Sequence, residues 1–144
     1  MSQYKELGSF IDRTYKVVRQ DLINRFKKAG IDITPEQWVI LAKLEEQDMY
    51  QTELASMSFR DKPTVSRIVD LLAKKQFVER IPDKEDGRKY HVSITKEGLT
   101  MINKARPFVE ESRKIGWINL TEEEYETLIV TLDKVFSNYS EKSE

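Results

Sequence analysis

Residues 51–94 read QTELASMSFRDKPTVSRIVDLLAKKQFVERIPDKEDGRKYHVSI, and the succession of patterns within this stretch decides the fold. Its opening, QTELA, predicts a short helix with Leu54 and Met57 facing inward. After a short link, Asp61 is placed to cap a second helix, and Pro63 lies in the first turn of that helix. Two short helices separated by such a turn predict a helix-turn-helix unit, in which the second helix keeps one face available for a groove.

The second of these helices has an apolar face and a polar face. The apolar face consists of Val65, Ile68, Val69 and Leu72. The outward positions are Thr64, Ser66, Arg67, Asp70 and Lys74. Arg67 can present two donors to a guanine edge, and the two hydroxyls can reach bases or phosphates. Lys62, at the helix start beside exposed backbone donors, is expected to hold a phosphate. A solvated helix face gives the same pattern.

A hairpin follows, because after Lys75 the apolar period changes from helical to alternating. Phe77, Val78 and Ile81 are apolar on the near side of the loop, and on the far side Tyr90, Val92 and Ile94 alternate strictly with His91 and Ser93. The connecting loop, Pro82–Lys89, is polar, so its tip should project into solvent, and its Asp86–Gly87 pair favours a tight primed turn. A helix-turn-helix with a projecting hairpin is a winged helix. Its wing offers Lys84, Arg88 and Lys89 to phosphates or the minor groove.

Helical patterns flank this winged unit on both sides. Before it, an apolar stripe from Leu7 to Phe26 predicts a long helix ended by Gly30. Thr34, Pro35 and Gln37 then form a capping-box start for a helix that buries Trp38, Leu41 and Leu44. After it, Thr95 caps a helix with the stripe Leu99, Ile102, Ala105 or Arg106, and Val109. A second capping box, Thr121 to Glu124, starts the last helix.

The three flanking helices predict a dimer. Their apolar stripes are too extensive for one three-helix bundle to bury, so a second copy of the chain is the expected cover. The residues expected at this interface are Leu7, Phe10, Leu128, Leu132 and Phe136. A two-fold dimer would present two groove-binding helices about 34 Å apart, one turn of DNA.

Charge is distributed unevenly along the 144 residues. The net charge is −1, yet residues 60–91 hold nine basic and six acidic groups, whereas residues 110–144 hold four basic and nine acidic groups. A basic module within an acidic chain is what would touch a polyanion. Glutamates in a helix's first turn, as at Glu122–Glu124, are favoured by the helix dipole and need no metal.

Composition excludes several classes of protein and site. The chain has no cysteine, and therefore no disulfide, thiolate zinc site or thiol nucleophile, and its single histidine argues against the usual metal and acid–base sites. We expect no cofactor, no metal and no enzymatic activity. No run is long and apolar enough to span a membrane, and the N-terminus lacks the order of a secretory signal, so we expect a cytoplasmic protein.

The chain resembles the MarR family of bacterial winged-helix transcription regulators over nearly its whole length. The resemblance is carried by Gln37-Trp38-x-Ile40-Leu41, Glu53-Leu54-Ala55, Lys62-x-Thr64-Val65-Ser66-Arg67-x-Val69-x-x-Leu72, Val78-x-Arg80 and Asp83-x-x-Asp86-Gly87-Arg88, ending in Ile94-Thr95-x-x-Gly98. It implies a single domain over residues 1–144, with a winged helix-turn-helix at 34–95 and dimerisation helices at 1–30 and 96–140.

The resemblance also implies how such a protein works. It implies a homodimer on pseudo-palindromic, double-stranded operator DNA, often released by a small aromatic ligand. Arg88 matches the family's wing arginine, and Asp86 would brace a basic side chain such as Arg88, although a plain Asp-Gly turn would look the same. Tyr15 and Trp38 are candidates for a ligand pocket, and the alternative is that both are core residues.

Two positions depart from the family pattern. Glycine is usual at Gln76, where the second helix of the unit ends, so Gln76 must adopt the left-handed conformation or alter the helix exit. A smaller residue is commoner at Pro63, which can shift the start of that helix.

We therefore predict a mainly α protein with a small β-hairpin wing, a winged helix-turn-helix flanked by N- and C-terminal dimerisation helices. The expected function is sequence-specific DNA binding by a transcriptional regulator, a repressor relieved by a small aromatic ligand. The alternative is a winged-helix protein-interaction module without DNA binding. Such a module would tend to replace Arg67 and Arg88 with neutral or apolar residues, and this chain keeps both.

Overall fold

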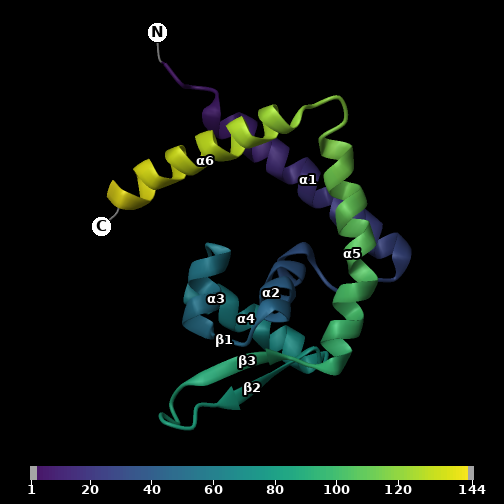
Figure 1. Ribbon diagram of the computed structural model, residues 1–144, viewed down its shortest axis with the longest axis vertical. Helices are drawn as coiled ribbons and strands as arrows, with labels where there is room; N and C mark the ends of the chain where they lie inside the picture. The colour runs from purple at the N-terminus through teal and green to yellow at the C-terminus, as the bar shows by residue number, and fades with distance from the viewer. Residues whose placement is uncertain (1–2, 143–144) are drawn as a thin grey trace. The chain divides into compact units, whose positions relative to one another are not determined.

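The computed structural model describes residues 3–142 and confirms a mainly helical winged-helix fold (Figure 1). The chain forms two compact units, Met1–Ser112 and Arg113–Glu144. The helices are α1 (Leu7–Ala29), α2 (Pro35–Glu46), α3 (Gln51–Ser58), α4 (Lys62–Lys74), α5 (Lys96–Gly116) and α6 (Glu122–Lys142). The strands are β1 (Met49–Tyr50), β2 (Val78–Pro82) and β3 (Tyr90–Ile94). Within residues 3–142, no helix combines the length and the apolar character needed to cross a membrane.

The junction of α1 and α2 forms as the sequence predicts. Gly30 ends α1 in the left-handed conformation, at φ 69°. The capping box of α2 is complete, because the Gln37 N–H donates to the Thr34 hydroxyl at 3.1 Å and the Thr34 N–H donates to the Gln37 side chain at 3.1 Å. Pro35 needs no hydrogen-bond partner at the first helical position. The predicted inward residues of α2, Trp38, Leu41 and Leu44, are all buried.

Helices α3 and α4 form the helix-turn-helix. Asp61 caps α4 by accepting the Thr64 N–H at 2.7 Å, and the four predicted inward residues of α4 are all buried. The expectation that Met57 faces inward is wrong, because its side chain is 42 % exposed. Helix α3 ends at Ser58, directly after Met57, and is followed by Phe59 in the left-handed conformation; its buried residues are Leu54 and Ala55.

The wing is part of a three-stranded antiparallel sheet in the order β1-β3-β2. Val78 pairs with Ile94, Arg80 with Val92 and Pro82 with Tyr90, so β2 and β3 form the predicted hairpin. Strand β1, whose Met49 pairs with Val92, is not predicted from the sequence. In Figure 1 the tip of this hairpin extends past helices α2, α3 and α4.

The tip of the hairpin differs from the expected primed turn. A primed turn of this kind needs a positive φ at Gly87, and Gly30 is the only glycine with positive φ among the described residues. The loop closes instead through two backbone hydrogen bonds, from the Lys89 N–H to the Asp86 carbonyl at 3.0 Å and from the Asp83 N–H to the Lys89 carbonyl at 2.9 Å. The seven residues between β2 and β3 leave room for this wider loop.

Helix α5 starts against the exit of α4. Gln76 takes the left-handed conformation, at φ 67°, and the Thr95 hydroxyl donates to its carbonyl at 2.6 Å. Thr95 also caps α5, accepting the Gly98 N–H at 3.0 Å. The stripe of α5 uses Gly98, Ile102, Ala105 and Val109. Leu99 was expected in this stripe and is 39 % exposed, because Gly98 is the residue that meets the α4 exit.

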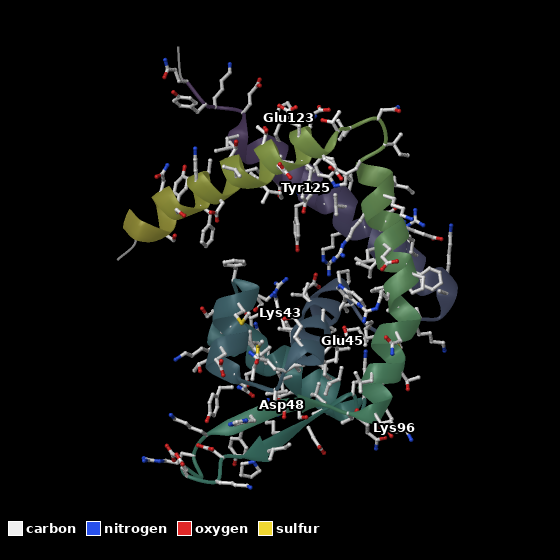
Figure 2. The ribbon with its side chains drawn as sticks, viewed as in Figure 1. Lys43, Glu45, Asp48, Lys96, Glu123 and Tyr125 are labelled. Carbon is white, nitrogen blue, oxygen red and sulfur yellow. The ribbon has the colours of Figure 1, made fainter. Side chains whose placement is uncertain are left out.

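The second unit consists of the end of α5 and all of α6. The predicted capping box is present, with the Glu124 N–H donating to the Thr121 hydroxyl at 3.0 Å and the Thr121 N–H donating to the Glu124 carboxylate at 3.1 Å. Tyr125, labelled with Glu123 in Figure 2, packs edge-on against Trp117 with ring centroids 5.0 Å apart. The apolar stripe of α6 remains exposed.

Candidate nucleic-acid interface

The outward face of α4 places its candidate DNA-contacting side chains together. Lys62, Arg67 and Lys74 are exposed, and Thr64 and Ser66 are half-buried. Arg67 Nη2 donates to the Thr64 hydroxyl at 3.4 Å, so these two side chains lie on one surface of the helix. This surface can present a guanidinium and two hydroxyls to base edges.

The N-terminus of α4 is less open to an anion than the sequence suggests. The Asp61 carboxylate already accepts the Thr64 N–H, and this hydrogen bond lowers the pKa of Asp61. Asp61 therefore stays ionised and holds one of the backbone donors of the first turn. A phosphate at this end would depend mainly on the exposed ammonium group of Lys62.

The wing exposes all three of its predicted cations, Lys84, Arg88 and Lys89. Asp86 lies close to Arg88, the residue that it is expected to brace. Its Oδ1 accepts the Arg88 N–H at 3.1 Å and is 3.5 Å from Arg88 Nε. Lys89 Nζ is 5.7 Å from the centre of the Tyr50 ring. The loop backbone is thus ordered by Asp86, while the Arg88 side chain extends into solvent.

A pocket of about 520 Å³ lies among α3, α4 and the wing. It is lined by Tyr50, Gln51, Thr52, Ser66, Asp70, Arg80, Arg88, Lys89 and Tyr90. Three of these side chains are cationic and one is anionic, so the lining carries net positive charge. Such a surface suits the sugar-phosphate backbone that lies between a major and a minor groove.

Arg80 also belongs to this surface, and its role there is not predicted from the sequence. Its Nε donates to Gln51 Oε1 at 2.8 Å, and its Nη2 is 2.7 Å from Asp70 Oδ1. The sequence contains Arg80 in the motif Val78-x-Arg80, but the alternation of β2 indicates only which face of the strand it occupies. Its partners lie on α3 and α4, and a pattern within one strand cannot reveal them.

His91, the single histidine, lies on β3 beside the base of the wing. Its ring meets the Tyr50 ring edge-on at 4.2 Å between centroids, and its Nε2 is 3.9 Å from Asp83 Oδ1. Burial, followed by the nearby Asp83 carboxylate, raises the pKa of Tyr50. His91 therefore belongs to the packing between β1 and β3.

The predicted dimer residues present apolar surface on helices of both units. Leu7 and Phe10 on α1, and Leu128, Leu132 and Phe136 on α6, are between 38 % and 49 % exposed. Side chains of this size on long amphipathic helices are candidates for contact with another protein surface.

The two candidate ligand-pocket residues have different surroundings. Trp38 is only 6 % exposed and belongs to the hydrophobic core, with the Arg106 guanidinium 5.8 Å from its ring centre. Tyr15 on α1 is 54 % exposed. One turn further along α1, Arg19 forms a two-bond ion pair with Glu36 at 2.6 and 2.7 Å, which lowers the pKa of Glu36.

In sequence and in fold, the chain is similar to known transcription regulators. The MarR family model matches residues 33–90, the region from the start of α2 to the start of β3. A transcriptional regulator of Bacillus subtilis, YybA, is 26 % identical over 119 residues, covering 82 % of this chain and 79 % of that protein.

Solved structures show the same fold over almost the whole chain. A mutant of Escherichia coli MarR in complex with operator DNA matches with a TM-score of 0.82 and 26 % identity, covering 94 % of this chain and 99 % of the other. Bordetella bronchiseptica BpsR, whose DNA binding is regulated by 6-hydroxynicotinic acid, matches with a TM-score of 0.84 and 20 % identity, covering 94 % and 96 %.

Proposed function

We propose that this protein is a sequence-specific repressor of transcription. Its fold is that of the MarR family, and the model of that family matches its sequence over residues 33–90. The members of this family are transcription regulators and not enzymes. The observation that carries the proposal is the surface formed by α4 and the wing. It combines exposed Arg67 on the helix with exposed Lys84, Arg88 and Lys89 on the hairpin.

The two parts of this surface have different tasks. Helix α4 enters the major groove, where Arg67 reads a base and Thr64 and Ser66 reach bases or phosphates. Lys62 and Lys74 hold phosphates at the two ends of the helix. The wing reaches the adjacent minor groove or its phosphates through Lys84, Arg88 and Lys89.

We propose that the active form is a homodimer in the cytoplasm. The exposed apolar stripes of α1 and α6 supply surface for a second copy, and a two-fold dimer fits two half-sites about 34 Å apart. On this view residues 1–144 act as one functional domain, in which residues 1–30 and 96–140 serve dimerisation.

We further propose that a small aromatic acid relieves repression. BpsR, the relative with a TM-score of 0.84, has its DNA binding regulated by 6-hydroxynicotinic acid. Exposed Tyr15 is the candidate contact on this chain, because an aromatic ring can stack on such a ligand. Trp38 would line the ligand site only if the core around it opened.

Selection from fragmented genomic DNA with the purified protein tests the proposal. The expected result is strong enrichment of fragments that share a pseudo-palindromic sequence, and weaker recovery when aromatic acids are added. A protein-interaction module would enrich no sequence, and that outcome would contradict the proposed function.

A further inference from the structure

The proposed DNA-binding face of α4 carries an acidic residue, Asp70. Asp70 lies on the outward side of α4, one turn after Arg67, and its side chain is 60 % exposed. A lone carboxylate in this place would repel the phosphates that Lys62, Lys74 and the wing attract.

The structure pairs this carboxylate with the wing. Arg80 Nη2 lies 2.7 Å from Asp70 Oδ1, and the same nitrogen donates to the Ser66 carbonyl at 3.4 Å. Both contacts are to α4. The Arg80 side chain is 28 % exposed and that of Asp70 is 60 % exposed, so the pair is shielded from solvent on its arginine side.

Arg80 also contacts a third element, helix α3. Its Nε donates to the Gln51 side chain, the first residue of α3, at 2.8 Å. Along the sheet, Arg80 pairs with Val92, which pairs in turn with Met49 on β1. One guanidinium therefore joins β2, at the base of the wing, to both helices of the helix-turn-helix.

We propose that the Asp70–Arg80 ion pair sets the position of the wing relative to α4 and neutralises Asp70 toward DNA. Arg80 is thus a positioning residue, which acts on DNA through Asp70 and does not itself hold a phosphate. This inference rests on the proposed function, since it describes how the two groove-binding elements are held in register.

The proposal makes the effect of removing Arg80 depend on residue 70. Without Arg80, the Asp70 carboxylate is exposed to the phosphates, and binding to every duplex weakens. If residue 70 is already neutral, nothing is left to repel the phosphates. A direct phosphate contact by Arg80 would instead be lost equally in both backgrounds.

Four proteins decide the question: wild type, Arg80→Met, Asp70→Asn and the double variant. Each is titrated at several salt concentrations with a duplex selected from genomic DNA and with a scrambled duplex of the same composition. On the scrambled duplex, Arg80→Met should weaken binding about tenfold in the wild-type background and less than about twofold in the Asp70→Asn background, with the salt slope unchanged.

Equal losses in the two backgrounds, with a salt slope lower by about one unit, would overturn the proposal in favour of direct phosphate contact. Arg106→Met is the matched control, since Arg106 forms a comparable ion pair with Glu45 on α2 at 2.6–2.7 Å and does not line the pocket. It should bind both duplexes as the wild type does. Glu45 is labelled in Figure 2.

Asp70→Asn alone keeps the test decisive should Arg80→Met fail to fold, because the Asp70 side chain is well exposed. The single variant should bind the scrambled duplex at least as tightly as the wild type and lose about fivefold in preference for the selected duplex. An unchanged preference would contradict the positioning role. If the wild type itself shows no preference, it is the proposed function that fails.

Discussion

Gln76 occupies a backbone conformation that glycine adopts at much lower cost. Its φ is 67°, its side chain is exposed, and its backbone carbonyl accepts the Thr95 hydroxyl. A side chain at positive φ crowds the following carbonyl, which is why helices commonly end in glycine. Gly30 fills the equivalent role after α1, at φ 69°.

Gln76→Gly should therefore stabilise the protein by about 0.5–1 kcal/mol, since relief of strain exceeds the added entropy of the unfolded chain. The reciprocal change, Gly30→Ala, should cost about 1 kcal/mol. Urea unfolding measures both. A lower free energy of unfolding for Gln76→Gly would mean that the glutamine side chain stabilises the α4 exit in some other way.

Glu36 should make stability depend on pH. Its ion pair with Arg19 lowers its pKa below the ordinary 4.5, so its contribution is full above about pH 4.5 and is lost as pH falls through the folded-state value. Glu36→Gln should remove about 1 kcal/mol at pH 7 and less at pH 3. Measurement of the free energy of unfolding between pH 3 and pH 7 checks this prediction. The matched control is Glu46→Gln, at an exposed glutamate of the same helix. Equal losses at both pH values would contradict the ion-pair account.

The sequence correctly predicts the roles of residues whose contacts are local. It does not predict the roles of residues whose contacts are distant along the chain. Thr34, Asp61 and Thr95 bond to backbone atoms three residues away, and all three caps are present. Leu99 fits a helical stripe as well as Gly98 does, and only the approach of the Phe77 carbonyl decides between them. The DNA-contacting roles of the α4 and wing residues remain predictions.

At the scale of elements, α5 packs tightly against the α4 exit. A Cβ on Gly98 would lie 2.1 Å from the Phe77 backbone carbonyl oxygen and 2.7 Å from Ile94 Cγ1. The Phe77 carbonyl also accepts the Thr95 N–H at 3.0 Å, so it cannot move without loss of that bond. Glycine at position 98 thus allows α5 to begin directly against the last turn of α4 and the end of β3.

Gly98→Ala should destabilise the protein by about 3 kcal/mol, because the neighbouring atom is backbone and cannot rotate away. Gly116→Ala is the matched control, as a Cβ there meets nothing within 4 Å, and it should be neutral or stabilising by up to about 1 kcal/mol. Thermal unfolding of both variants checks the pair. A neutral Gly98→Ala would show that α5 can shift at low cost.

The elements that can be predicted from the sequence are those in which apolar residues recur at a regular spacing. The helices and the β2–β3 hairpin satisfy this, because their apolar residues recur at helical or alternating spacing over many positions. Strand β1 has only two residues, Met49 and Tyr50, and exists through pairing with Val92 and His91. No local period can indicate a strand of that length.

For the whole molecule, the exposed stripes of α1 and α6 predict an obligate dimer. Light scattering at micromolar concentration should give twice the 17.0 kDa mass of the chain. Burial of side chains such as Phe10 and Leu132 would provide the driving force, at about 25 cal/mol per Å² of apolar surface. A stable, well-folded species of 17.0 kDa under these conditions would contradict the prediction.

The most direct test of the whole account is the titration of wild type and Arg67→Ala with a selected duplex and its scrambled counterpart. Arg67→Ala should weaken binding to the selected duplex by about 1–3 kcal/mol per half-site and reduce discrimination at one symmetric base position. Lys84→Ala, the matched change in the wing, should weaken binding to both duplexes alike and lower the salt slope by about one unit per contact. Unchanged binding by a folded Arg67→Ala protein would contradict the claim that α4 reads DNA.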